Sequence, residues 1–168
     1  MDSQLHQLKL TGSQGGEWTE KVRYEEALQG LRLTTADEAK EFAAATKIDI
    51  LVPALGTTHG LSRKMIKGEE QKRLDIERIA EIRKTTGLFL TLHGACGTND
   101  EDMRRAIQAG ITEIHINTEL RLAWRRGLET AFAKDRDQTV PYKLLPAAVN
   151  AMKQIVSSRL SLFSGRQG

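Results

Sequence analysis

The sequence contains one cysteine and three prolines, is poor in aromatic residues, and has no long apolar run. A single cysteine excludes an internal disulfide framework and is typical of a reducing compartment. No segment reaches the about 20 apolar residues that span a bilayer, and the N-terminus lacks the apolar core of a signal peptide. These absences predict a cytoplasmic protein with no membrane partner.

The sequence also lacks a large excess of either positive or negative charge. The 168 residues include 25 Lys or Arg and 22 Asp or Glu, which gives a formal net charge of +3. The basic residues form separate pairs, such as Arg63-Lys64 and Arg104-Arg105, with no aromatic residues between them. This pattern favours solvated helix faces over nucleic-acid binding, and it suits a small anionic substrate. The length is that of one ordinary domain.

Apolar strand patterns alternate with amphipathic helix patterns. Strands are predicted at 48–55, 88–92 and 112–116, and helices at 20–29, 34–46, 74–86, 98–109, 120–133 and 145–163, with a loop at 62–69. This alternation predicts right-handed βαβ units and a parallel sheet over residues 34–168, preceded by an N-terminal segment at 1–33 that the pattern does not define. Three or four βα units are too few for a closed eight-stranded barrel, which needs about 250 residues. The fold class is therefore α/β, either an open sheet or part of a barrel.

Two of the predicted strands end in a histidine followed by a glycine. Gly56-Thr57-Thr58-His59-Gly60 follows the first strand, and His93-Gly94-Ala95-Cys96-Gly97-Thr98 follows the second. Because neighbouring parallel strands end side by side, we expect His59 and His93 to converge. Neutral imidazoles bind zinc, and the two glycines let backbone N–H groups face an anion. Two histidines alone favour loop residues that only form hydrogen bonds over a metal site, and the flanking glycines strengthen the metal interpretation.

Small polar residues accompany these glycines. Thr98, Asn117 and Thr118 suit phosphate oxygens, and they also suit helix caps. Cys96 has no base beside it in sequence, so a plain small residue is a better interpretation than a nucleophile. His115 lies between Ile114 and Ile116, where a core or site-lining histidine is predicted.

Taken together, three motifs resemble those of the class II (zinc-dependent) fructose-bisphosphate aldolases, a family that includes tagatose-bisphosphate aldolases. They are G-T-T-H-G at 56–60, L-H-G-A-C-G-T at 92–98 and I-N-T-E-L-R at 116–121. The resemblance extends over residues 34–163 and implies the C-terminal half of a TIM barrel. It implies reversible cleavage of fructose 1,6-bisphosphate into dihydroxyacetone phosphate and glyceraldehyde 3-phosphate, with zinc polarising the ketose carbonyl. The alternative is a non-catalytic half-barrel that binds a sugar phosphate or a partner.

The resemblance also implies roles for individual residues. His59 and His93 match two zinc ligands of the family. Gly60, Gly94 and Cys96 match the loops that bind the substrate phosphate, where a monovalent cation assists, and Asn117 and Thr118 match a second phosphate-binding pair.

The sequence departs from the family pattern at several positions. No H-x-D-H motif occurs, so the family's further zinc histidine and its proton-donor aspartate have no counterpart and the catalytic residue is unknown. Cys96 replaces a serine, His115 an asparagine, and Tyr142 an arginine that holds the far phosphate. The surroundings of His6 give no support for a third zinc ligand. These departures predict that self-association or a complementing chain completes a sugar-phosphate site.

Overall fold

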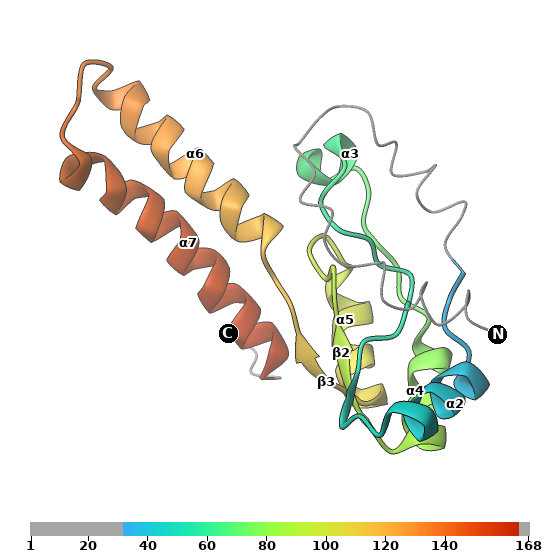
Figure 1. The fold of residues 1–168 in the computed structure, drawn as a ribbon. Coiled ribbons are helices and arrows are strands. Elements are labelled where there is room, and N and C mark those ends of the chain that lie inside the picture. Colours follow the sequence, from blue (N-terminus) through green and yellow to red (C-terminus); the bar gives the residue numbers. More distant parts are fainter. Residues whose placement is uncertain (1–31, 165–168) are drawn as a thin grey trace. The chain divides into compact units, whose positions relative to one another are not determined.

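The structure, a computed structural model, describes residues 32–164 (Figure 1). The helix predicted at 20–29 lies outside the described residues. The chain forms two compact units, Met1–His115 and Ile116–Gly168, and each is described by itself. No helix of the described part is both long and apolar enough to cross a membrane.

The first unit contains a three-stranded parallel sheet. Its strands are β1 (Ile50–Leu51), β2 (Phe89–Leu92) and β3 (Ile111–Ile114), in the order β1-β2-β3. The side chains of Leu51, Leu90, Leu92 and Ile111 are buried, as the apolar pattern of the strands predicts. This sheet confirms the predicted alternation of parallel strands with helices.

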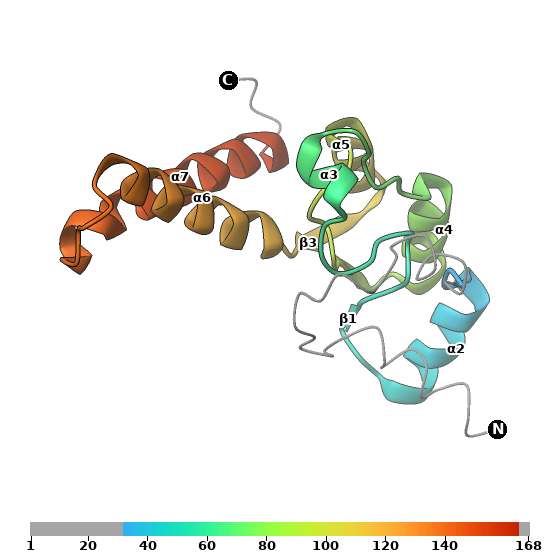
Figure 2. The same cartoon turned by 90° about the horizontal axis from the view of Figure 1, so that it is seen from above.

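Within residues 32–115, four helices belong to the same unit. They are α2 (Ala36–Thr46), α3 (Arg63–Lys67), α4 (Ile76–Thr86) and α5 (Asp100–Ala109). Helix α4 contacts both α2 and α5, and Figure 2 shows α2 and α4 side by side. Ile79 and Ile82 of α4 and Met103 of α5 are almost completely buried, so these helices supply much of the core.

Helix α2 begins as its sequence predicts. The Thr35 side chain accepts a hydrogen bond from the Glu38 backbone N–H, and the Glu38 carboxylate accepts one from the Thr35 N–H. This reciprocal capping box satisfies two backbone donors that the first turn leaves unpaired. Gly87 and Gly110 stand at the C-caps of α4 and α5, also as predicted.

The strand predicted at 48–55 is wrong in its length, because β1 has only two residues. Pro53 has no N–H to donate to a sheet ladder. The next residue, Ala54, pairs with Thr34 instead: its N–H donates to the Thr34 hydroxyl over 2.9 Å, and its carbonyl accepts from the Thr34 N–H over 3.0 Å. The backbone groups beyond β1 are thus satisfied outside the sheet.

The loop predicted at 62–69 is also wrong, because it contains α3. The Ser62 hydroxyl accepts a hydrogen bond from the Met65 N–H over 3.1 Å, and Gly68 closes the helix in the left-handed conformation. Other boundaries shift by a few residues. Helix α4 begins at Ile76, two residues after the predicted start, with Asp75 as its N-cap, and β3 lies one to two residues earlier than predicted.

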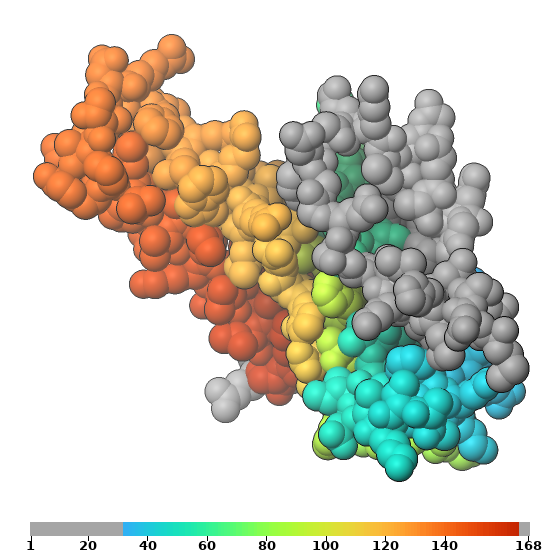
Figure 3. All heavy atoms as spheres, viewed as in Figure 1, coloured from blue at the N-terminus to red at the C-terminus, as the bar shows by residue number. Residues whose placement is uncertain are grey.

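The second unit is a helical hairpin of α6 (Thr118–Lys134) and α7 (Pro141–Phe163). Helix α7 starts four residues before the predicted position, with Pro141 in its first turn. The helices pack closely at Gly127, where an added Cβ would lie 2.5 Å from the Ala148 Cα. Figure 3 shows their atoms packed against each other along the hairpin. Arg159 and Glu119 form an ion pair of 2.7 Å between the two helices.

Candidate functional site

The loops that follow β1 and β2 bring His59 and His93 together, as predicted. Their ring centroids are 4.5 Å apart. His115, which follows β3, lies on the other side of His93 with its ring centroid 5.0 Å away. All three histidines are solvent-exposed. The ends of three parallel strands therefore carry a row of imidazoles.

A side-chain hydrogen bond and a close backbone approach hold the two histidine loops against each other. The Thr57 hydroxyl donates a hydrogen bond to the His93 carbonyl over 2.6 Å. Gly94 has a φ of +69°, and an added Cβ would lie 2.9 Å from the Thr58 carbonyl oxygen. A residue without a side chain is therefore required at position 94, because both its conformation and this close approach exclude a Cβ.

The row of imidazoles affects protonation. Partial desolvation of its ring, by the protein atoms around it, lowers the pKa of His93 below the usual value, and the charges that His59 and His115 carry when protonated lower it further. A lowered pKa keeps the His93 ring neutral at neutral pH. The neutral ring is the form that binds a metal ion.

His115 forms a pair with an acidic side chain. Its Nε2 lies 2.5 Å from Oε1 of Glu113, and this hydrogen bond lowers the pKa of the Glu113 carboxyl. The His115 backbone N–H donates to the Leu92 carbonyl over 3.0 Å, which continues the pairing of β2 with β3. Of the two predicted environments, the structure shows His115 beside the site rather than in the core.

A further residue, Lys72, contacts both loops and was not predicted from the sequence. Its side chain is 1% exposed. The Nζ atom donates hydrogen bonds to the carbonyl oxygens of Thr58, Gly60 and Gly94, over 2.5, 2.8 and 3.1 Å. One ammonium group therefore joins the loop that carries His59 to the loop that carries His93.

The two histidine loops also contain a buried cysteine and two buried hydroxyl groups. Cys96 is 4% exposed, which does not suit a nucleophile open to substrate. The hydroxyl oxygens of Thr58 and Thr98 are buried, and within the described part neither has a hydrogen-bond partner. Buried hydroxyls without partners are rare in native proteins.

Asn117 and Thr118 belong to the second unit. Asn117 is the N-cap of α6, and Thr118 is the first residue of that helix. Both therefore lie at a helix N-terminus, where backbone N–H groups favour an anion. Their convergence with the histidine loops stays a prediction.

The described residues supply an incomplete metal site. His59 and His93 offer two imidazoles, but residues 32–164 contain no group of three or more His, Cys, Asp or Glu placed to hold a metal ion. A catalytic zinc needs three protein ligands and an open position. The pair therefore fits part of a zinc site.

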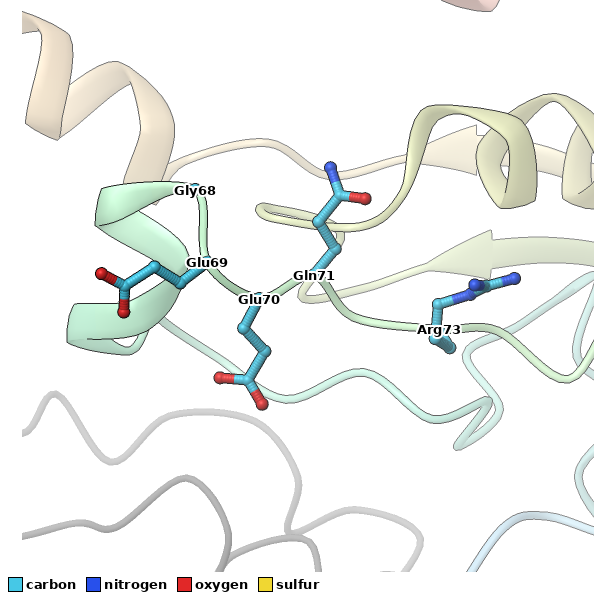
Figure 4. A pocket seen from close by; sticks show the side chains of 5 residues that line it. All are labelled: Gly68, Glu69, Glu70, Gln71 and Arg73. Carbon is cyan, nitrogen blue, oxygen red and sulfur yellow. The ribbon is translucent and has the colours of Figure 1, made fainter.

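A pocket of about 310 Å³ is lined by the segment that connects α3 to α4 in the sequence. Figure 4 shows its lining residues, which are Gly68, Glu69, Glu70, Gln71 and Arg73. None of them is a predicted site residue. The Arg73 guanidinium pairs with Asp102 over 2.6 Å, so its charge is already compensated within the protein.

Comparison with known families identifies the family of this chain. The family model described as fructose-bisphosphate aldolase class-II matches residues 11–167. The chain belongs to this family. The match includes the loops that carry His59 and His93 and the N-terminus of α6.

Solved structures of this family share the fold. The YdjI aldolase from Escherichia coli K12 is 31% identical with a TM-score of 0.64, over 79% of this chain and 46% of that one. A candidate fructose-1,6-bisphosphate aldolase from Coccidioides immitis is 27% identical with a TM-score of 0.63, over 79% and 43%.

A fructose-bisphosphate aldolase from Campylobacter jejuni is 15% identical with a TM-score of 0.64, over 79% of this chain and 45% of that one. At this identity the likeness concerns the fold alone. The three comparisons confirm the partial barrel fold, and this chain spans less than half the length of each of these three proteins.

Proposed function

We propose that this chain forms part of a class II aldolase site that cleaves a ketose bisphosphate, with fructose 1,6-bisphosphate as the substrate to test first. The observation that carries the proposal is the 4.5 Å approach of the His59 and His93 rings at adjacent strand ends. Membership of the aldolase family supports it.

In this proposal, the two histidines hold a zinc ion together with a ligand from outside the described residues. When bound, zinc would supply a Lewis acid that polarises the ketose carbonyl. The lowered pKa of His93 keeps its ring neutral, so protons compete weakly for this ligand.

The glycine-rich loops would bind a substrate phosphate. Gly60, Gly94 and Gly97 have positive φ angles, which let consecutive backbone N–H groups turn toward an anion. The partnerless hydroxyls of Thr58 and Thr98 add two donors beside these glycines. Asn117 and Thr118 would supply further donors at the N-terminus of α6.

Completion of the site requires another copy, another chain or another segment. Exposed apolar side chains on or next to the strands support this requirement. Ile50, Val52 and Phe89 are 48%, 44% and 53% exposed. In a closed barrel such side chains are covered. Self-association or a complementing chain would bury them and could supply the proton donor and the third ligand.

The proposal is tested first by zinc binding. Isothermal titration of the metal-free chain with zinc should show binding that His59→Ala and His93→Ala each abolish. His6→Ala is the matched control, and it should bind zinc like the native chain. Unchanged zinc binding in both site variants would contradict the proposal. Loss of zinc binding in His6→Ala would place the third ligand in this chain.

Activity is tested separately by a coupled retro-aldol assay with fructose 1,6-bisphosphate, with added zinc and with chelator. Zinc-dependent cleavage would support the aldolase function. Sugar-phosphate binding without cleavage, and without any effect of chelator on stability, would favour the non-catalytic half-barrel instead.

A further inference from the structure

The ammonium group of Lys72 is surrounded by oxygen atoms of the kind that also bind free metal cations. Three backbone carbonyl oxygens, from Thr58, Gly60 and Gly94, surround its Nζ atom at 2.5–3.1 Å, and these three oxygens are called the carbonyl cage below. Rings of carbonyl oxygens are the ligands with which proteins replace the hydration shell of a monovalent cation. A positive charge at this point is therefore a requirement of the loop geometry.

The requirement follows from electrostatics. Carbonyl oxygens that converge on one point carry partial negative charges that repel one another, and little water reaches this point because the lysine side chain is 1% exposed. A cation balances these charges. An ammonium group has three N–H donors, which matches the three carbonyl acceptors.

The backbone of Lys72 is fixed on the opposite side. Its N–H donates to the Gly97 carbonyl over 2.8 Å, and its carbonyl accepts from the Asn99 N–H over 3.1 Å. It pairs in parallel with Thr98 as an isolated bridge. The main chain is thus attached to the loop after Cys96, and the side chain reaches across to the carbonyls on both sides of His59.

We propose that Lys72 is a tethered cation that fills a monovalent-cation site between the two histidine loops. The site then needs no free potassium or sodium ion, contrary to the expectation from the family resemblance. Lys72 acts as a positioning residue, since it fixes the carbonyls next to His59 and His93. The proposal concerns cation binding, so its test requires no aldol cleavage.

The test measures the melting temperature of the full chain in chloride salts of sodium, potassium, ammonium and tetramethylammonium at equal ionic strength. Tetramethylammonium has no N–H donor and is too large for the carbonyl cage. The native chain should melt at the same temperature in all four salts. A selective stabilisation of the native chain by potassium, sodium or ammonium would overturn the proposal.

Lys72→Ala should empty the cage. Its melting temperature should fall by on the order of 5 °C in tetramethylammonium and recover in ammonium or potassium. Lys72→Met, which fills the cage with an uncharged side chain, should melt lower without selective recovery. A folded Lys72→Ala variant that responds equally to all four salts would overturn the proposal.

Two controls keep the result specific. Lys67→Ala removes an exposed lysine of α3 and should leave both the melting temperature and the salt response unchanged. Met103→Ala destabilises the core by a comparable loss of side chain, and it should show no cation selectivity. Selective recovery in Met103→Ala would mean a general salt effect and would overturn the assignment. If Lys72→Ala does not fold, the native-chain comparison alone decides.

Discussion

Replacing Asp102 with alanine is expected to destabilise the first unit through one buried backbone group. Asp102 is 1% exposed and accepts three hydrogen bonds. Two come from the Arg73 guanidinium, over 2.6 and 2.9 Å, and the third comes from the Leu74 backbone N–H over 3.1 Å. This carboxylate holds the segment directly after Lys72 against the start of α5.

The size of the destabilisation depends on which hydrogen-bond donor, the Arg73 guanidinium or the Leu74 N–H, is left without an acceptor. The Arg73 side chain is 71% exposed, so its guanidinium regains water when the carboxylate is removed, and its ion pair adds little. Leu74 is 9% exposed, so its N–H has no such replacement. An unsatisfied buried donor costs about 1–3 kcal/mol. We therefore expect Asp102→Ala to lower the melting temperature by roughly 3–10 °C.

The assay is thermal unfolding of the full chain followed by circular dichroism. Asp102→Asn keeps an acceptor for the Leu74 N–H, so it should cost less than Asp102→Ala. Arg73→Ala should also cost less, because it leaves that backbone bond intact. The reasoning is refuted if Arg73→Ala destabilises the protein as much as Asp102→Ala does, since the ion pair would then be the dominant interaction.

Three further outcomes are expected. The pKa of Asp102 is lowered chiefly by its hydrogen bond from the Arg73 guanidinium. The stability that this carboxylate contributes is therefore complete above about pH 3.9 and is lost as the pH falls through its folded pKa. Unfolding by guanidinium chloride at several pH values should show a smaller loss of stability at low pH in Asp102→Asn than in the native chain, and parallel curves would contradict this. Gly94→Ala should melt lower than Gly60→Ala, because both have positive φ but only the Gly94 Cβ would meet backbone, at 2.9 Å; equal melting temperatures would refute the steric argument. Gly127→Ala places a Cβ 2.5 Å from the α7 backbone and should cost about 1–3 kcal/mol by overpacking, more than the ~1 kcal/mol gain in helix propensity; a higher melting temperature of this variant would show that the helices separate freely.

The parts of the fold that local sequence determines were predicted well. Thr35 followed by Glu38 is a capping box in sequence and in structure. Gly87 ends α4 as predicted, because a left-handed residue there favours glycine. The approach of His59 and His93 was also predictable, since adjacent parallel strands bring their ends together.

The parts that tertiary contacts determine were not predicted. The apolar run at 48–55 gave no sign that Thr34 would pair with Ala54 and shorten β1. Lys72 stands between two polar residues in sequence, with no periodicity that marks it as buried. Its role arises from three carbonyls that lie 12 to 22 positions away and converge only in the folded chain.

The close helix contact at Gly127 also has a consequence for the order of folding. The α6–α7 hairpin is formed by helices adjacent in sequence, whereas β1 pairs residue 50 with residue 89 and must close a long loop first. Local contacts form faster, because less chain entropy is lost before they become favourable. When the chain refolds, amides of α6 and α7 are therefore expected to gain protection from hydrogen exchange before those of β1 and β2.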